Sequence, residues 1–219
     1  MKKVAIVTGA SRGIGAATAV KLSESGFHVI AVSRNKDLLN IIKSDNIEPY
    51  VMDVTDTEAI NRFQEYIKDK QVQLLVNNAG GGSEFKNVDD STRDEWRYCY
   101  EVNVISPMHL SQIVIPIMQR LGGGHIIMIS SIAAYKPYPT SSNYSAAKMA
   151  QSVLSNTMRQ ELVNKNIKVT EIIPGNVATS GPQYGSISSE DMAGAIAWCA
   201  NLPDYVSVNS LNMSHIKNI

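Results

Sequence analysis

The chain has 219 residues, of which 44% are hydrophobic and 18% are charged, a composition typical of a globular domain with a full-sized core. Twenty acidic residues balance twenty basic ones, which excludes a net field that would attract nucleic acid or an anionic membrane. The two cysteines, Cys99 and Cys199, and the four histidines lack the spacing of a metal site or a disulfide framework. With no leader-like or membrane-spanning segment in the sequence, we expect a cytoplasmic protein without a metal.

Short β-branched runs alternate with longer segments of helical period along the chain. The first strand is predicted at Val4–Val7 and the first helix at Ile14–Ser25. Nearly continuous apolar runs bounded by polar residues or glycine predict further buried strands at Val29–Val32, Tyr50–Met52, Leu74–Val76, Ile126–Ile129 and Val169–Ile173. This alternation predicts an α/β protein, a single-domain Rossmann fold over residues 1–219 with a doubly wound parallel sheet of about seven strands.

Two long helices are predicted in the middle of the chain. The first spans Ser91–Leu121, and Pro107 and Pro116 inside it should kink or locally break its hydrogen-bond ladder. The second spans Asn143–Val163.

The carboxyl-terminal part predicts one more helix and one more strand. Ser188 and Asp191 have the spacing of a capping box, which predicts a helix that continues to Cys199. A last strand is predicted at Val206–Leu211.

A glycine-rich loop follows the first predicted strand. It begins at Thr8 and carries Gly9, Gly13 and Gly15, so its backbone amides and the amino terminus of the next helix converge on one point. That arrangement suits a pyrophosphate, and the alternative is a plain glycine turn. A P-loop is excluded because no Lys-Ser or Lys-Thr pair follows the last glycine.

The end of the second predicted strand bears on the choice of nicotinamide cofactor. A carboxylate there would bind the ribose 2′-hydroxyl of NAD and repel the 2′-phosphate of NADP. The strand instead ends in Ser33 and Arg34, and Arg12 in the glycine loop offers a second cation. NADP is therefore favoured, the alternative being that both arginines are solvated surface charges.

Tyr144 and Lys148 stand four positions apart, which places a phenol and an ammonium on one face of a helix. Tyr66 and Lys70 share this spacing, but their helix also carries apolar residues, and no candidate catalytic residue lies near them in the chain. We therefore interpret Tyr66 as a residue that packs against the core. Tyr144 differs because Ser131 follows the Ile126–Ile129 strand at the edge where ligands bind in an open α/β sheet.

Nearly the whole chain resembles the short-chain dehydrogenase/reductase family. Ser131 stands thirteen positions before Tyr144, as in that family, and the resemblance implies a catalytic set of Asn103, Ser131, Tyr144 and Lys148. It also implies that Asp53-Val54 holds the adenine, that Asn77 to Gly80 supports the central strand, and that Pro174 to Thr179 holds the nicotinamide carboxamide. Because relatives in this family commonly assemble through the two long helices, the resemblance further implies a homo-oligomer, a tetramer or a dimer. The implied cofactor-binding residues are Gly9, Ser11, Arg12, Gly13, Ile14, Gly15, Ser33, Arg34, Asp53, Val54, Asn77, Ala79, Gly80, Tyr144, Lys148, Pro174, Gly175, Val177 and Thr179.

The chemistry of a hydride-transfer enzyme accounts for these residue types. A free tyrosine has a pKa of about 10, and we expect the Lys148 ammonium and the oxidised nicotinamide to lower it in Tyr144, the general acid and base. Ser131 would bind the substrate oxygen, and Lys148 the nicotinamide ribose. Asn103 would hold a water beside Lys148, or alternatively bond only its own helix backbone.

The substrate is predicted from the end of the chain. Only a short loop, Ser180–Ser189, separates Thr179 from the next predicted helix, which implies a small or open pocket. The tail Val206–Met213 is similar to the branch of the family that oxidises serine and other 3-hydroxy acids with NADP. A 3-oxoacyl thioester reductase and a non-catalytic NADP-binding redox sensor remain open as alternatives.

Overall fold

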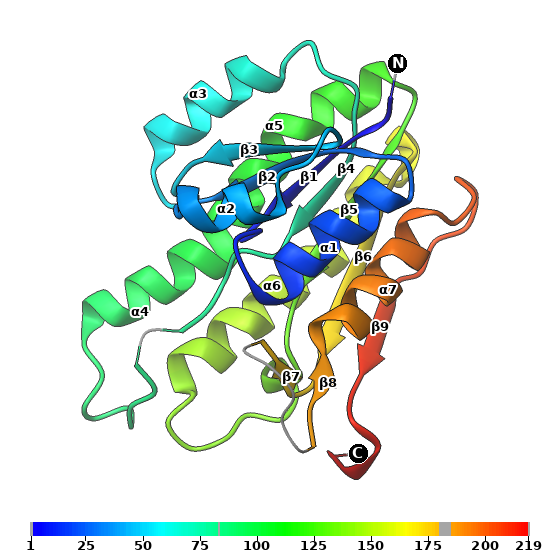
Figure 1. Ribbon diagram of the computed structural model, residues 1–219. Helices are drawn as coiled ribbons and strands as arrows, with labels where there is room; N and C mark the ends of the chain where they lie inside the picture. Colours follow the sequence, from blue (N-terminus) through cyan, green and yellow to red (C-terminus); the bar gives the residue numbers. More distant parts are fainter. Residues whose placement is uncertain (1, 83, 180–184, 219) are drawn as a thin grey trace.

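A sheet of seven parallel strands forms the centre of the computed structural model, which describes residues 2–82, 84–179 and 185–218 (Figure 1). The strand order is β3-β2-β1-β4-β5-β6-β9. The strands are β1 (Val4–Thr8), β2 (His28–Ser33), β3 (Ile47–Val51), β4 (Val72–Asn77), β5 (Gly124–Ile129), β6 (Ile167–Pro174) and β9 (Ser210–Met213). The predicted doubly wound parallel sheet is therefore confirmed.

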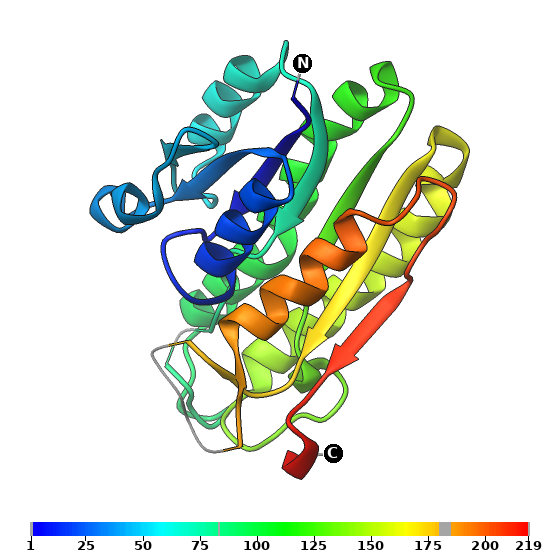
Figure 2. The same ribbon diagram turned by 45° about the vertical axis from the view of Figure 1, so that its right-hand side comes forward.

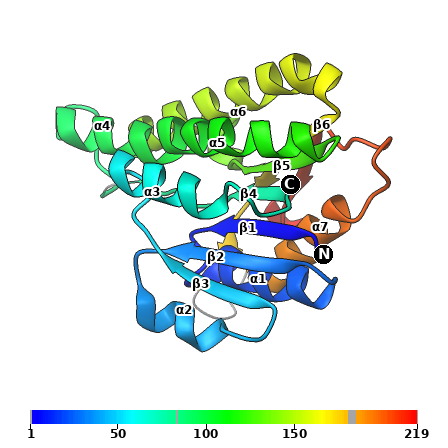
Figure 3. The same cartoon turned by 90° about the horizontal axis from the view of Figure 1, so that it is seen from above.

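Helices cover both faces of the sheet (Figure 3). One face carries α1 (Gly13–Glu24), α2 (Lys36–Ile42) and α7 (Ser189–Ala200), and the other carries α3 (Thr57–Ile67), α4 (Arg93–Tyr100), α5 (Ser106–Arg120) and α6 (Ser142–Leu162). Each face has its own apolar core, one around Phe63 and Leu75 and the other around Leu22 and Ile127. The smaller elements are a π-helix (Glu101–Ile105), 3₁₀ turns at Ile132–Ala134, Val163–Lys165 and Ile216–Asn218, and the paired strands β7 (Val177–Ala178) and β8 (Ile187–Ser188).

The strand order fixes where a ligand can bind. β1 lies between β2 and β4, so the chain turns back across the sheet at the β1–β4 boundary. In open α/β sheets the crevice for a ligand opens at the carboxyl ends of the strands at this switch point. The loops that follow β1, β4 and β5 all leave the sheet at that edge, the lower edge in Figure 1.

The predicted helix Ser91–Leu121 is helical from Arg93 to Arg120, and the break expected at Pro107 is present as a π-helix at Glu101–Ile105 that separates α4 from α5. The Ser106 amide donates to the Glu101 carbonyl, five residues back. Pro107 has no N–H to donate to the carbonyl of Asn103, which explains why the regular ladder fails there. Pro116, in contrast, lies inside α5 without ending it.

The carboxyl-terminal elements agree with the sequence except for one boundary. The Ser188 hydroxyl and the Asp191 carboxylate form the predicted capping box at the start of α7. The last strand begins at Ser210 instead of Val206, because the Val206 amide closes a turn onto the Pro203 carbonyl. β9 then pairs with β6 at the edge of the sheet (Figure 2). The expected loop Ser180–Ser189 includes residues 180–184, which lie outside the described residues.

Candidate active site

Hydrogen bonds to the Thr8 side chain join the ends of β1 and β4 at the switch point. The Thr8 hydroxyl accepts from the Asn78 and Ala79 amides at 3.0 and 2.9 Å and donates to the Val76 carbonyl. The Asn78 side chain donates to the Thr8 carbonyl at 2.8 Å. These bonds hold the glycine loop and the loop after β4 at a fixed separation.

Glycine is required at three places in the first loop. Gly9 and Gly13 have φ angles of 65° and 54°, in the left-handed region that other residues rarely adopt. A Cβ atom on Gly15 would lie 2.3 Å from the Gly9 carbonyl oxygen and 2.5 Å from the Asn78 amide nitrogen. The loop can therefore turn tightly only with glycine at these positions.

A cavity of about 390 Å³ opens over this loop and contains most of the predicted cofactor residues. Four residues that line it were not predicted as cofactor contacts: Met52 after β3, Asn78, Tyr98 on α4 and Val102. The predicted residues that line it are Gly9, Ser11, Arg12, Gly13, Ile14, Ser33, Arg34, Asp53, Val54, Ala79, Gly80 and Thr179. The predicted nucleotide site therefore gathers at the crevice.

Arg34 is held between two neighbours at one end of this nucleotide cavity. Its guanidinium lies 3.5 Å from the Asp53 carboxylate, which in turn accepts hydrogen bonds from the amide and hydroxyl of Thr55. Tyr98 and then Asp53 raise the pKa of Arg34 above its ordinary value. The arginine is thus charged, and two thirds of its side chain remains exposed, at 66%.

The structure places the other predicted cofactor residues differently. Asn77 is buried under the sheet and donates to the Pro107 carbonyl and the Ser111 hydroxyl of α5, so it supports β4 and lines no part of the cavity. Gly175 is tied to the edge strand, since its amide donates to the Met213 carbonyl at 2.7 Å. Pro174 ends β6 and Val177 lies in β7, both close in the chain to Thr179.

Tyr144 and Lys148 share a face of α6, beside the end of β5. The Lys148 nitrogen lies 5.9 Å from the centre of the Tyr144 ring. It donates to the Ile129 carbonyl at 2.7 Å and to the Gln151 side-chain oxygen at 3.0 Å. Ser131, the N-cap of the turn after β5, hydrogen-bonds the Tyr144 phenol.

The pKa of Tyr144 is raised in the protein alone, whereas the expected lowering combines the Lys148 ammonium with the charge of the oxidised nicotinamide. Burial raises the pKa of Tyr144, the hydrogen bond with Ser131 opposes that shift, and Tyr138 and Cys99 add to it. The Lys148 nitrogen lies 5.9 Å from the centre of the Tyr144 ring and donates to the Ile129 carbonyl and to Gln151. The phenol therefore keeps its proton.

Burial also shifts the pKa of Lys148, a residue that is only 3% exposed. It lowers the pKa of Lys148 to about 8, while Cys99 and Glu171 oppose the shift. A lysine with a pKa in this range exchanges its proton at physiological pH far more readily than an exposed one.

Asn103 lies in the π-helix and joins it to the loop after β4. Its amide nitrogen donates to the Gly81 carbonyl at 2.7 Å and to the Cys99 carbonyl at 2.8 Å, and its oxygen accepts from the Gly81 amide. A Cβ atom on Gly80 would lie 2.7 Å from the Asn103 oxygen and 3.2 Å from the Lys148 nitrogen. Asn103 thus bonds its own helix, as the alternative held, and also borders the space next to Lys148.

Aromatic side chains stand beside Tyr144. The Phe85 ring lies 6.2 Å from the Tyr144 ring and 6.1 Å from the Tyr138 ring. Tyr135 is turned away, since its hydroxyl contacts Ser152 and Glu171. Of Tyr135 and Tyr138, the structure therefore brings Tyr138 close to Tyr144.

Tyr66 packs against the core, as predicted from its apolar neighbours. Its ring lies 4.8 Å from that of Tyr50, and its hydroxyl bonds the Glu48 carboxylate. Lys70 lies over this ring, 4.3 Å from its centre.

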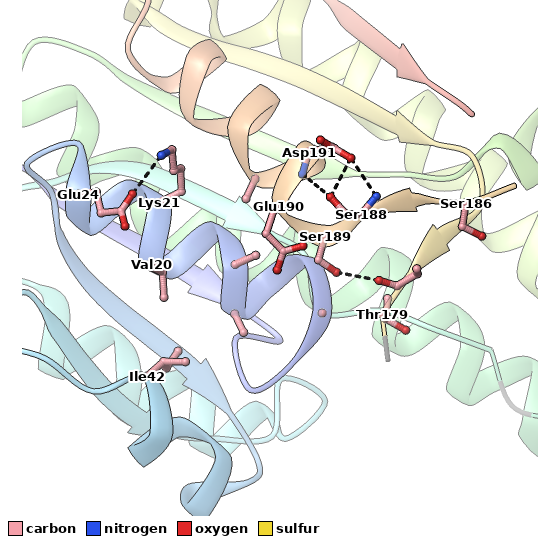
Figure 4. Close-up of a pocket in the computed structure, with 15 residues that line it drawn as sticks. Val20, Lys21, Glu24, Ile42, Thr179, Ser186, Ser188, Ser189, Glu190 and Asp191 are labelled. Carbon is pink, nitrogen blue, oxygen red and sulfur yellow. Dashed lines mark hydrogen bonds and ion pairs between the residues drawn. The ribbon is translucent and has the colours of Figure 1, made fainter. Parts of the chain in front are cut away.

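The larger cavity between α1 and α7, of about 850 Å³, does not contain the catalytic candidates (Figure 4). Ala16, Ala17 and Val20 of α1 line one side. Ser188 and Asp191, on the other side, are engaged with one another in the capping box, as the dashed lines show.

In the described parts of the chain, no three histidine, cysteine or acidic side chains cluster as metal ligands would. None of the described helices has both the length and the apolar character that crossing a membrane requires.

A Rossmann sheet with a glycine-lined crevice beside a Ser-Tyr-Lys arrangement defines a nucleotide-dependent oxidoreductase. The comparison with known proteins agrees, because the short chain dehydrogenase family matches residues 3–185. The chain belongs to the short chain dehydrogenase family.

Relatives and solved structures cover nearly the whole chain. An uncharacterized oxidoreductase of Mycobacterium tuberculosis is 35% identical and aligns with 96% of this chain and 90% of its own. Serine dehydrogenase from Escherichia coli is 28% identical with a TM-score of 0.90, covering 98% of each chain. An alcohol dehydrogenase from the archaeon Thermococcus sibiricus, complexed with 5-hydroxy-NADP, is 27% identical with a TM-score of 0.89, covering 98% of this chain and 97% of its own.

The Gly15→Ala substitution tests the packing of the glycine loop. The added methyl group would overlap the Gly9 carbonyl, so we expect the free energy of unfolding to fall by about 1–3 kcal/mol and NADPH binding to weaken at least about tenfold. Urea denaturation and fluorescence titration measure both effects. Gly194→Ala is the control, since no heavy atom lies within 4 Å there and α7 should gain about 0.5–1 kcal/mol. An unchanged Gly15→Ala protein would contradict the argument.

The buried Lys148 should make stability depend on pH. Its pKa is lowered from 10.5 to about 8 in the folded protein. The free-energy cost of burying the charged ammonium therefore applies in full below pH 8, and it is lost as the pH rises from 8 to 10.5. Relative to Lys148→Met, the wild-type protein should therefore gain about 3 kcal/mol between these limits. Urea denaturation at several pH values measures the difference, with Lys165→Met, an exposed lysine, as control. Parallel curves for wild type and Lys148→Met would contradict the assignment.

Proposed function

We propose that the chain is an NADP-dependent oxidoreductase that transfers a hydride between the nicotinamide and the carbonyl or alcohol carbon of a small substrate. The observation that carries the proposal is the partly buried Tyr144, whose phenol is bonded to Ser131 and which stands one helical turn from Lys148. This arrangement lies beside the crevice in which the glycine loop opens.

The residues at the crevice fit a dinucleotide phosphate. The left-handed glycines leave the backbone open at the amino terminus of α1, where backbone amides suit a pyrophosphate. Arg34 is charged and mostly exposed, with a planar set of donors that suits a 2′-phosphate. The alcohol dehydrogenase of similar structure, complexed with 5-hydroxy-NADP, supports NADP as the cofactor.

Each catalytic residue has a task that its contacts support. When bound, NADPH would supply the hydride. Tyr144, whose pKa is raised by burial, holds a proton for the substrate oxygen, and Ser131 donates a hydrogen bond to that oxygen. Lys148, with a pKa of about 8, restores the proton to the phenol and binds the cofactor ribose. Asn103 keeps the loop at Gly81 in place beside Lys148.

A small 3-hydroxy acid, or its oxo partner, is the proposed substrate. The similarity to serine dehydrogenase supports this class. Phe85 and Tyr138 next to Tyr144 would limit the size of a group bound there. A 3-oxoacyl thioester and a purely regulatory role are the rival outcomes of the experiment below.

A cytoplasmic homo-oligomer, a tetramer or a dimer, is also proposed. Met149 and Val153 are exposed one turn apart on α6, at 40% and 58%, and Ile105 is exposed at 44%. Apolar side chains in such a row are typical of surfaces that a second copy covers. Sedimentation as a monomer would contradict this part of the proposal.

Arg34→Ala should change the choice of cofactor. Because the substitution removes the phosphate-binding donors, we expect the Kd for NADPH to rise by about 10 to 100-fold and that for NADH to change little. Fluorescence titration with both cofactors measures the ratio. Arg62→Ala is the matched control, since Arg62 is 68% exposed and lies 4.0 Å from an acid, Asp56. An unchanged preference in Arg34→Ala would refute the assignment.

Tyr144→Phe should bind NADPH normally but lose turnover by about 100 to 10,000-fold, because the phenol proton is missing. The assay is NADPH oxidation or NADP reduction with a panel of 3-hydroxy acids, their oxo partners, simple ketones and oxoacyl thioesters. Preference for the thioesters would replace the proposed substrate class. Near-normal turnover in Tyr144→Phe would remove the acid and base role, and NADPH binding without any turnover by the wild type would favour a sensor.

A further inference from the structure

Two of the three N–H donors of Lys148 are already used by the protein. One points to the Ile129 carbonyl at the end of β5, at 2.7 Å, and another to the side-chain oxygen of Gln151, at 3.0 Å. The ammonium also borders Gly80 and the Asn103 oxygen on its other side. The two bonds thus fix the direction in which the remaining donor points.

A glutamine at position 151 destabilises the fold unless the contact of its side-chain oxygen compensates the cost of burying it. Gln151 is 0% exposed, and in the described part of the structure its amide nitrogen has no hydrogen-bond partner. A buried polar group without a partner destabilises a fold, and methionine or leucine would fill a similar volume without that loss. The contact with Lys148 is the one that uses the amide oxygen.

The charged and titratable groups around Lys148 come from three elements. Tyr144 is on α6, Cys99 on α4 and Glu171 on β6. Burial lowers the pKa of Lys148 to about 8, and Cys99 and Glu171 act in the opposite direction. An acceptor oxygen at 3.0 Å stabilises the charged form in the same sense as these two groups.

We propose that Gln151 is a positioning residue, which together with the Ile129 carbonyl fixes the direction of the Lys148 ammonium and keeps it charged. The proposal rests on the function proposed above, in which charged Lys148 serves Tyr144. Gln151 itself need not touch substrate or cofactor, since it acts through Lys148 alone.

Gln151→Met and Gln151→Glu should move the pH profile of turnover in opposite directions. Without the acceptor, Lys148 loses its proton earlier, so in Gln151→Met the alkaline limb of kcat should shift down by about one pH unit and kcat should fall by about three- to tenfold. A carboxylate at the same place favours the ammonium, so in Gln151→Glu the limb should shift upward. The Kd for NADPH at each pH, from fluorescence, gives a readout that does not depend on turnover.

Ser155→Ala is the control. Ser155 is buried on the same helix face, one turn further, and its hydroxyl bonds only the Gln151 backbone carbonyl. Its profile should match that of the wild type. Shifts in the same direction for both Gln151 variants, or no shift in either folded variant, would overturn the proposal. If the wild type itself lacks turnover on the whole panel, the proposed function fails instead.

Discussion

The burial of one ammonium group constrains the whole catalytic region. The buried Lys148 side chain extends from α6, and its nitrogen donates a hydrogen bond to the last carbonyl of β5. This bond fixes the position of the amine relative to both the helix and the strand. Removing a charge from water has a large cost unless hydrogen bonds compensate it. Those bonds come from β5 and α6 themselves. The direction of the amine is therefore set by the packing of the core and needs no loop to hold it.

The rest of the crevice is arranged around this fixed point. The Thr8 hydroxyl binds β1 to the loop after β4, and that loop reaches Asn103 through Gly81. Asn103 in turn lies in the π-helix between α4 and α5. Residues far apart in the chain thus meet through a short series of backbone contacts, and the nucleotide cavity adjoins the buried amine.

Local patterns in the sequence predicted the parts of the site that depend on neighbouring residues. The glycine loop and the Ser188 capping box follow from spacing within one short segment, and the structure has both. The pairing of Ser131 with Tyr144 follows from the family resemblance, and the two side chains are hydrogen-bonded in the structure. The spacing of Gln151, three residues after Lys148 on one helix, offered the same signal. This spacing alone does not identify Gln151 as functional, because a buried glutamine has no functional signature by itself.

The features of the site that the sequence did not predict depend on tertiary structure. Tyr98 reaches the nucleotide cavity from α4, and Phe85 reaches Tyr144 from a loop, and neither has a partner near it in the chain. The side of the sheet to which Asn77 turns is set by packing against α5. Burial raises the pKa of Tyr144 and its hydrogen bond with Ser131 opposes that shift, and spacing along a helix determines neither effect.

The π-helix at Glu101–Ile105 makes the chain unusually sensitive to its own length at this place. A π turn accommodates one residue more than an α turn, so the two flanking helices are out of phase by about 100°. That offset lets α4 direct Cys99 to the loop while α5 directs Val114 into the core. Deleting one residue between α4 and α5 would restore an unbroken spiral and rotate one of those faces away from its neighbour. A change of one residue in length would therefore disturb both helix faces at once, whereas a point substitution acts at one position.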